Sequence, residues 1–455
     1  MALLQDLIQQ IDDPVLRERI MQETDKLVKQ KKFGLVFEEH LPECTPLYDV
    51  PIRVGCKVAL KTGYVSDIYT VLKIDGDTVL CDRRETHEQK TFQMSDIVAV
   101  AEFGEPIYPT LKPLDFVENA PDSDLWHTLI EADNYHALQL LEYLYAEKVD
   151  CIYIDPPYNT GAKDWKYNND YVDSSDAYRH SKWLSMMEKR LKIAKKLLDP
   201  KNILPGRKFT YPKSLYAVHD TIRFITKEKK EALIVDFFAG SGTTLHAINL
   251  LNSEDGGHRR CIMVTNNEVS VDEAKVLDKQ GHKPGDAAWE KVGIARYVTW
   301  PRTVCSIEGH DVHGKPLKGN YLSSDLPMSD GFKANAAFFK LSFLDKTSIA
   351  LGMQFKELLP VLWMKGGAID KCPVLEGEEL PNMLILPKNK MAVLIDEIFY
   401  PEFEEQLAQH PEIQTVFIVT DSEAAYREMI RAYESKACYQ LYRDYLDNFR
   451  INTGR

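Results

Sequence analysis

The sequence predicts an α/β fold built on an open parallel sheet with about four recognisable strands. Apolar runs ending at Ile154 and Val235 each pass directly into a loop, the first rich in proline and the second rich in glycine. Strand, helix and strand follow one another over residues 127–154, which is the order of a parallel βαβ unit. We expect four regions: a helical arm (1–47), a small β-barrel (48–108), the α/β domain (114–330) and a small C-terminal α/β domain (335–455).

Composition limits the class of protein. A chain of 455 residues is long enough for roughly two to four domains, and 44% hydrophobic with 27% charged residues is typical of a globular protein. Acidic residues interrupt the apolar N-terminal segment well before the ~18 residues of a membrane span, so we expect a soluble, cytoplasmic protein with no membrane partner. The eight cysteines include no Cys-x-x-Cys pair, and His310 and His313 have no further ligand at metal spacing. We therefore expect free thiols and no metal site.

The first hundred residues contain no chemical motif. Residues 1–32 alternate apolar and charged positions at helical spacing and are broken at Asp13-Pro14, which predicts two short amphipathic helices. Short β-runs follow at residues 56–60, 68–72, 78–81 and 97–100, with a hairpin signal at Asp75-Gly76. The pattern resembles Tudor and KOW modules. A role as a spacer or docking module is favoured over contact with nucleic acid.

The α/β domain follows a predicted linker at residues 109–113. We expect its strands at residues 127–131, 149–154, 232–235 and 260–264, and its helices at residues 137–146, 177–198 and from about 214 to 225. The C-terminal domain has a similar rhythm, with strands near 383–386, 391–395 and 416–420 and helices at 401–409 and 422–433. It lacks a glycine-rich phosphate loop, so we predict no chemistry there.

The stretch over residues 151–161 combines a buried strand with a rigid loop. The apolar run ends at Asp155-Pro156-Pro157-Tyr158, where two prolines can neither extend a central strand nor donate to it. A carboxylate and an aromatic ring are thus left at the carboxyl end of a strand, where open α/β sheets bind ligands. A strand-to-turn junction whose acid caps the loop is the simpler explanation of this motif taken alone.

A second motif places an acid at a strand end and two glycines before a helix. It reads Asp236-x-Phe238-x-Gly240-x-Gly242. Glycine allows positive φ and close approach of a ligand, and the following helix offers free N–H groups. Many α/β folds have such a turn, so the motif is weak alone and becomes specific when paired with the proline motif.

The two motifs together resemble the S-adenosylmethionine-dependent amino-methyltransferases of DNA. Their order, with the catalytic motif before the cofactor loop, is similar to the β-class arrangement of type III modification subunits. The resemblance covers roughly residues 120–305 and implies a Rossmann-like methyltransferase sheet with S-adenosyl-L-methionine as cofactor. It further implies cofactor contacts from Asp133 at the adenine, from Lys213 and Ser214 beside the methionine end, and from the loop residues Asp236, Phe238, Gly240 and Gly242.

The resemblance also implies a chemistry. The exocyclic amine of a base is a weak nucleophile hidden in the duplex, so the base must be flipped out and oriented. Tyr158 would stack on the base, while the Asp155 carboxylate and the Pro156 carbonyl would accept hydrogen bonds from the amine. Pro157 completes the catalytic motif. Asp rather than Ser before Pro-Pro-Tyr favours adenine N6 over cytosine N4, and Asn would be the pattern of glutamine methyltransferases.

Two features depart from the family pattern. The strand at residues 260–264 should end in an acid that holds the ribose, but Thr265 follows it, so Glu268 is the candidate. Residues 199–231 number only 33, where a β-class enzyme normally has three more strands and a target-recognition region. We therefore expect a truncated sheet, with that region deleted or supplied by a partner such as a specificity or restriction subunit.

Charge is consistent with DNA as a partner. The net charge is −13, but residues 179–230 contain 15 Lys and Arg against 4 Asp and Glu, which can face phosphates or be an ordinary solvated helix surface. The first hypothesis is a DNA adenine-N6 methyltransferase of a restriction-modification or phage-defence system. The second is a catalytically silent remnant that acts as a cofactor-binding or partner-binding scaffold, and the third is a methyltransferase of RNA or protein.

Overall fold

A computed structural model describes most of the chain. The described residues are 20, 44–61, 67–84, 86–102, 104–156, 179–197, 215–322, 325–345, 355–375 and 380–441. The predicted N-terminal helices therefore lie outside them, apart from Ile20. Residues 41–158 and 189–455 form one compact unit, and residues 1–40 and 159–188 form another. The division of the chain into four domains stays a prediction.

The first sheet is antiparallel and confirms the predicted β-runs. Its order is β1-β6-β2-β3-β4-β5. The predicted hairpin at Asp75-Gly76 joins β3 to β4, with Asp75 paired to Thr78 and a positive φ of 59° at Gly76. Two of the six strands were not predicted, β1 and β5. The bounds are β1 (Cys44–Leu47), β2 (Lys57–Leu60), β3 (Tyr69–Asp75), β4 (Thr78–Arg83), β5 (Gln89–Gln93) and β6 (Ile97–Glu102).

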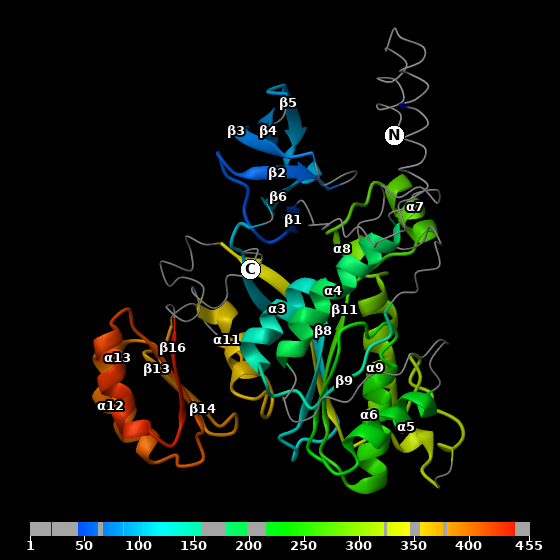
Figure 1. Cartoon of the computed structure of the whole chain (residues 1–455), viewed down its shortest axis with the longest axis vertical. Helices are drawn as coiled ribbons and strands as arrows, with labels where there is room; N and C mark the ends of the chain where they lie inside the picture. Colours follow the sequence, from blue (N-terminus) through cyan, green and yellow to red (C-terminus); the bar gives the residue numbers. More distant parts are fainter. Residues whose placement is uncertain are drawn as a thin grey trace. The chain divides into compact units, whose positions relative to one another are not determined.

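The central sheet contains the four predicted strands as one parallel block (Figure 1). These are β8 (Trp126–Glu131), β11 (Arg260–Thr265), β10 (Leu233–Asp236) and β9 (Cys151–Ile152), in that spatial order. Each neighbouring pair is parallel. The nearly continuous apolar runs of these strands are the reason for the arrangement, because both faces of a parallel sheet are buried. All four carboxyl ends therefore lie at one edge of the sheet.

Within the described residues the central sheet has six strands, two more than the sequence predicted. The expected linker at 109–113 lies within β7 (Tyr108–Glu118), an edge strand antiparallel to β12 (Asn335–Leu344), and β12 is itself parallel to β8. Pro109 and Pro113 made this segment resemble a linker, yet an edge strand tolerates proline because its outer side needs no donor. The linker prediction was wrong for that reason.

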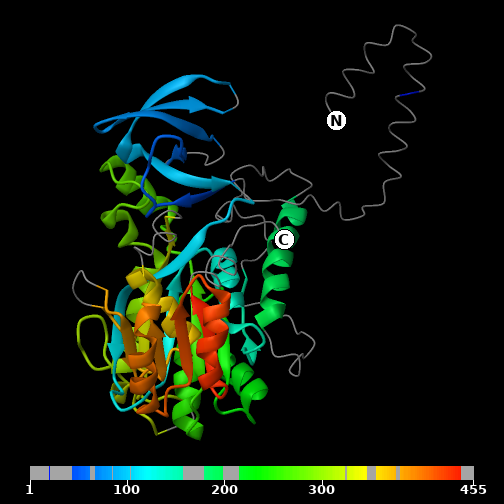
Figure 2. The same ribbon diagram turned by 90° about the vertical axis from the view of Figure 1, so that its left-hand side faces the viewer.

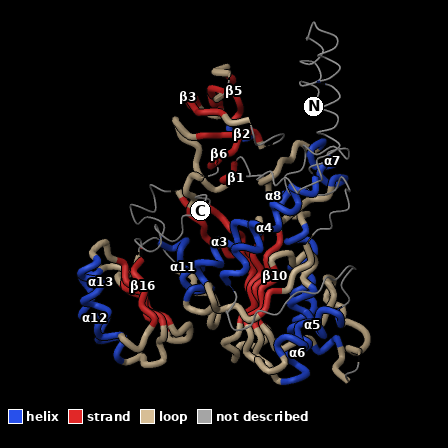
Figure 3. Tube along the Cα trace, viewed as in Figure 1, coloured by secondary structure: helices blue, strands red, loops and turns tan. Residues whose placement is uncertain are grey.

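Helices cover both faces of the central sheet (Figure 3). Strand residues alternate between the two cores: Ile262 and Val264 join one, and Cys261 and Met263 join the other. The helices against the first core are α3 (Asn134–Tyr145), α4 (Arg179–Leu197) and α11 (Phe355–Lys365). Those against the second are α5 (Leu215–Thr226), α6 (Thr243–Asp255) and α9 (Trp300–Glu308). Two shorter helices, α7 (Val271–Lys279) and α8 (Ala287–Glu290), follow β11.

The C-terminal sheet confirms the predicted strand and helix rhythm (Figure 2). Its order is β13-β14-β15-β16, with β14, β15 and β16 parallel. Helices α12 and α13 pack on one face and α11 packs on the other. The last strand, β16, was not predicted. The bounds are β13 (Met383–Leu386), β14 (Met391–Leu394), α12 (Tyr400–Ala408), β15 (Thr415–Val419), α13 (Glu423–Met429) and β16 (Ala437–Leu441).

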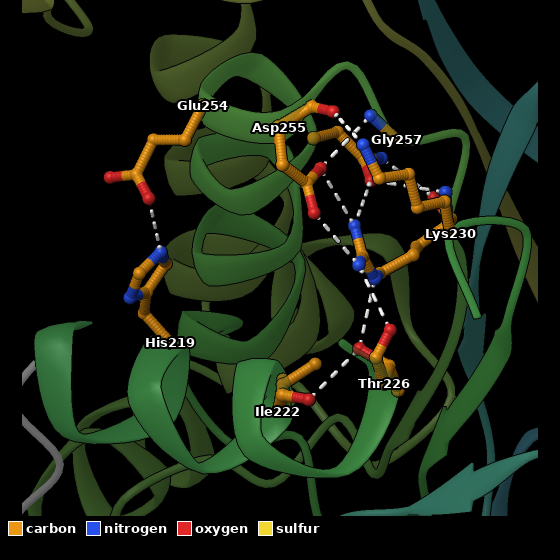
Figure 4. A network of polar contacts seen from close by, with 9 residues as sticks. His219, Ile222, Thr226, Lys230, Glu254, Asp255 and Gly257 are labelled. Atoms are coloured by element: carbon orange, nitrogen blue, oxygen red, sulfur yellow. Dashed lines mark hydrogen bonds and ion pairs between the residues drawn. The ribbon is translucent and has the colours of Figure 1, made fainter. Parts of the chain in front are cut away.

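A buried arginine joins α5, α6 and the start of β11. Arg259 is fully buried, and its Nη1 and Nη2 donate to the two carboxylate oxygens of Asp255 at 3.0 and 2.9 Å. Its Nε and Nη2 also donate to the Oγ1 and carbonyl oxygen of Thr226 at 2.8 and 2.9 Å. Figure 4 shows Thr226 and Asp255 converging from their two helices. This network holds the C-terminal end of α6.

Candidate active site at the carboxyl edge of the parallel sheet

The predicted acids lie at one edge of the central sheet. Asp236 is the last residue of β10, and Asp133, Asp155 and Glu268 follow β8, β9 and β11 by two or three residues. Hydrogen bonds between loops tie these ends together. Ala132 N donates to Thr265 O at 2.9 Å, Tyr153 N to Val235 O at 3.0 Å and Ala239 N to Val264 O at 3.1 Å. These bonds thus link the carboxyl ends of β8, β11, β10 and β9.

The glycine loop is held from inside by Asp236. This buried carboxylate accepts hydrogen bonds from Phe238 N at 3.0 Å and from Thr244 Oγ1 at 2.5 Å. Gly240 and Gly242 have φ values of +50° and +78°, where side chains other than glycine are strained. Asp236 therefore supports the loop from below, and the cofactor contact predicted for it stays a prediction.

A segment that the sequence did not single out closes over this loop. The π-helical turn η3 (Ala295–Thr299) runs into α9 and places the Thr299 hydroxyl on the carbonyl of Gly240 at 2.5 Å. A Cβ on Gly242 would lie 3.2 Å from Thr299 Cγ2. One turn later, Arg302 Nη1 donates to Ser241 Oγ at 2.9 Å and to Thr243 Oγ1 at 2.8 Å. Only the packing of η3 and α9 on the loop brings these residues to the site.

Asp133 occupies the N-cap of α3. Its Oδ1 accepts from Tyr135 N at 2.9 Å, and its Oδ2 lies 3.4 Å from Arg190 Nη2. Partial desolvation by the surrounding protein opposes ionisation, but the charge of Arg190, together with His136 and two backbone N–H donors, holds the pKa of Asp133 below its usual value. The carboxylate is ionised at neutral pH, and its side chain is 44% exposed at the sheet edge.

Arg190 is a residue that sequence reasoning missed. Its buried guanidinium donates to Asn134 Oδ1, and Asn134 Nδ2 donates to the carbonyl of Phe237 at 2.9 Å. The guanidinium carbon also lies 5.8 Å from the ring centre of Tyr135. Arg190 thus links α4, α3 and the start of the glycine loop. The sequence signal for Arg190 was its position in the basic segment 179–230. That segment contains many Lys and Arg residues and did not distinguish this buried arginine from solvated ones.

A second buried ion pair supports the β8 end. Glu131 is 4% exposed and accepts two hydrogen bonds from Arg296, from Nε at 2.6 Å and from Nη2 at 2.9 Å. Asn267 Oδ1 accepts from Arg296 N at 3.3 Å, and the carbonyl of Glu268 accepts from Ile294 N at 2.9 Å. Glu268 therefore lies between β11 and η3, and its contact with a ribose stays a prediction.

The proline motif is described only in part. Asp155 and Pro156 are partly buried and follow β9, the neighbour of the glycine-loop strand β10. Pro157, Tyr158, Lys213 and Ser214 lie outside the described residues, so their predicted roles stay predictions.

The described residues bring chemically useful groups to the carboxyl edge of the sheet. The glycine loop has two positive-φ glycines, Asp133 supplies an ionised carboxylate, and Arg302 supplies a cation bound to the loop hydroxyls. Within the described ranges, no group of three or more His, Cys, Asp or Glu side chains could hold a metal ion. No described helix is both long and apolar enough to span a membrane.

Comparison with known proteins places a match on the proline motif. Residues 149–205 match the family model for DNA methylase. The chain is 43% identical over 76 residues to the probable type III restriction-modification enzyme HindVI Mod subunit of Haemophilus influenzae, covering 17% of this chain and 9% of that protein. It is 38% identical over 95 residues to the EcoP15I Mod subunit of Escherichia coli, covering 16% and 15%. It is 46% identical over 65 residues to the type II methyltransferase M.KpnI of Klebsiella pneumoniae, covering 14% and 15%.

These matches are local. The aligned parts span between 9% and 15% of the three relatives, far less than two thirds of their length. The family match begins just before β9 and includes Asp155 and Pro156. The segment that carries the proline motif is thus similar to DNA methylases, and in the structure it lies directly beside the glycine-loop strand.

Proposed function

We propose that this chain is a site-specific DNA adenine-N6 methyltransferase that uses S-adenosyl-L-methionine and serves a restriction-modification or phage-defence system. One observation carries the proposal. The strand before Asp155 is the direct parallel neighbour of the strand before the glycine loop, with Cys151 paired to Ile234 and Ile152 paired to Val235. A base held at Asp155 and a cofactor held by the loop would therefore meet at one edge of the sheet.

The chemistry needs orientation rather than a strong base. The amino group of adenine is a weak nucleophile because its lone pair is delocalised into the ring. In our proposal the Asp155 carboxylate and the Pro156 carbonyl accept hydrogen bonds from this group, so that the lone pair points at the methyl group. The cofactor supplies an electrophilic methyl group on a sulfonium. Tyr158 stacks on the flipped base and Pro157 keeps the motif rigid.

The proposal gives each predicted cofactor residue a contact with S-adenosylmethionine. Asp133 is ionised and would accept from the adenine amino group, while the turn at Gly240 and Gly242 would let the methionine part approach the backbone. Glu268 would face the ribose, and Lys213 and Ser214 would flank the methionine end. This assignment is part of the proposal.

The relatives favour a restriction-modification context. Two of them are named as Mod subunits of type III restriction-modification enzymes and a third as a type II methyltransferase. We propose DNA as the substrate and a restriction or specificity subunit as a partner. In this proposal such a partner supplies the target-recognition region that the interval between the motifs is too short to contain.

Methyl transfer to DNA tests the proposal. The full chain would be incubated with tritiated S-adenosylmethionine and genomic DNA from a strain without adenine methylation. We expect label in DNA, and we expect Asp155→Ala to reduce it at least ~10³-fold, with cofactor affinity by calorimetry within about threefold of the wild type. Asp421→Ala, which removes an exposed acid after β15, is the matched control and should leave transfer unchanged.

The other hypotheses predict different results. Cofactor binding without transfer to any substrate, even with host extract added, would favour the silent scaffold. Label in RNA or protein alone would favour the third hypothesis. Equal transfer by the wild type and Asp155→Ala would remove Asp155 from the mechanism.

A further inference from the structure

Arg302 differs from the other arginines at the sheet edge. It lies on the first turn of α9, and a single nitrogen, Nη1, donates to both Ser241 Oγ and Thr243 Oγ1. Both hydroxyls belong to the glycine loop and the start of α6. The side chain is partly buried, and burial lowers the pKa of its guanidinium, although the group stays charged at neutral pH.

The charge of Arg302 has no acidic partner in the part of the chain that the structure describes. Three other arginines of the central domain have one: Arg296 and Arg190 at the carboxyl edge contact Glu131 and Asp133, and Arg259 at the far end of α6 contacts Asp255. A partly buried cation without a counter-charge is costly, so such a group usually meets a carboxylate or phosphate. The Nε and Nη2 donors of Arg302 also have no acceptor among the described residues.

We propose that Arg302 binds the carboxylate of the methionine part of the cofactor and thereby makes this site select S-adenosylmethionine over its decarboxylated form. The inference rests on the proposed function. The carboxylate is the only negative charge on this cofactor, and a guanidinium fork matches it with two parallel donors. The hydroxyls of Ser241 and Thr243 fix Nη1, so the remaining donors are oriented before the ligand arrives.

A phosphate of DNA is the competing ligand for the same cation. The contacts favour the cofactor, because the guanidinium is bound to the loop that also contains Gly240 and Gly242 and is partly buried against it. Phosphate contacts in DNA complexes typically come from exposed side chains that follow the backbone. Loss of DNA affinity in an Arg302 variant with unchanged cofactor affinity would overturn our assignment.

Calorimetry with two ligands that differ by one group tests the proposal. The full chain would be titrated with S-adenosylmethionine and with decarboxylated S-adenosylmethionine, which keeps the sulfonium and the ammonium. We expect the wild type to prefer the first by about 10- to 100-fold, the range of a charge-assisted pair. Arg302→Met should reduce this preference below about threefold, because it weakens the binding of S-adenosylmethionine alone. Arg302→Lys should keep part of the preference.

Two further variants separate binding from loop structure. Ser241→Ala removes one acceptor of Nη1 but keeps the guanidinium, so it should keep most of the preference. Lys275→Met removes an exposed cation on α7, paired only with exposed Asp272 at 3.5 Å, and should change neither affinity. The inference is wrong if Arg302→Met weakens the binding of both ligands equally, or if Ser241→Ala abolishes the preference for S-adenosylmethionine. In either case Arg302 acts only on the structure of the loop.

The same titrations distinguish this inference from the proposed function. A wild type that binds neither ligand contradicts both. A wild type that binds both ligands with equal affinity, and still methylates DNA, contradicts the role of Arg302 alone.

Discussion

The two termini of helix α6 are built from similar residues but differ in how their arginine is used. Each end has a left-handed glycine, Gly242 at φ +78° and Gly256 at φ +66°, and each has an arginine beside it. Arg259 at the C-terminal end is fully buried, and all three of its side-chain nitrogens have acceptors, including both oxygens of Asp255. Arg302 at the N-terminal end is only partly buried, and only its Nη1 donates hydrogen bonds within the described residues, to two neutral hydroxyls.

This difference separates a structural arginine from one placed for a ligand. A buried charge that serves the fold is neutralised and fully hydrogen-bonded within the protein, because an unpaired buried charge is strongly destabilising. A charge that serves a ligand can keep donors available, since the ligand completes its contacts. Substitutions along α6 can test this distinction.

Removal of Arg259 should have the largest effect on stability. Arg259→Met leaves the Asp255 carboxylate without its partner and the Thr226 carbonyl without a donor. We expect a loss of about 3 kcal/mol in the free energy of unfolding, near the lower end of the range for broken buried pairs because Asp255 is 29% exposed. Urea titration measures this. Arg302→Met should lose less than about 1 kcal/mol, and an equal loss in both variants would contradict the comparison.

A histidine within α6 should make stability depend on pH. Burial first, and the nearby charge of Arg302 second, lower the pKa of His246 from 6.5 to about 4 in the folded protein. The unfolded chain therefore binds the proton first, so this contribution is complete above about pH 6.5 and is lost as the pH falls toward 4. The pKa of His127, on β8, is also lowered to about 4, mainly by burial.

The pH dependence can be assigned by substitution. Between pH 7 and pH 4.5 we expect the wild type to lose about 2 kcal/mol more unfolding free energy than His246→Gln, by urea titration at each pH. His246 Nε2 lies 2.8 Å from the Tyr321 hydroxyl, so glutamine keeps a polar group at that position. Parallel pH profiles of the two proteins would show that His246 does not titrate in this range.

The two glycines that cap α6 should show a small effect on stability and the clearest functional contrast. Gly242→Ala and Gly256→Ala both place a side chain at positive φ and should each lose about 1 kcal/mol. A Cβ at Gly256 meets nothing within 4 Å, while one at Gly242 meets Thr299. We expect Gly242→Ala to weaken S-adenosylmethionine binding at least about tenfold and Gly256→Ala to change it less than twofold. Equal affinities of the two variants would mean that the loop accommodates a side chain at Gly242 without loss of ligand binding.

The sequence predicted local structure well where hydrophobic runs alternate with turn residues. The four parallel strands, the hairpin at Asp75-Gly76 and the first three strands of the C-terminal sheet lie close to their predicted positions. Hydrophobic runs bounded by turn residues are a local signal, so no tertiary information was needed. The misses were β1, β5, β7, β12 and β16. Of these, β7 contains prolines that resemble a linker, and β12 joins a sheet whose other strands lie far away in the chain.

For the candidate site, the sequence predicted which loops matter but not how they are supported. It pointed to Asp133, Asp155 and the glycine loop, all of which lie at one sheet edge. It did not point to Arg190 or Arg302, because a single basic residue on a helix has no local feature that distinguishes a packed side chain from a solvated one.

The sequence by itself determined the strand before Asp155, the loop at Gly240 and Gly242, and their family resemblance, because backbone limits on proline and glycine are properties of single residues. Only the tertiary structure decided that these two loops are neighbours, that Asp236 supports the loop from below, and that η3 and α9 bring Thr299 and Arg302 onto it. The physical reason is distance along the chain. Thr299 follows Gly240 by 59 residues, and only the packed sheet and helices bring them into contact.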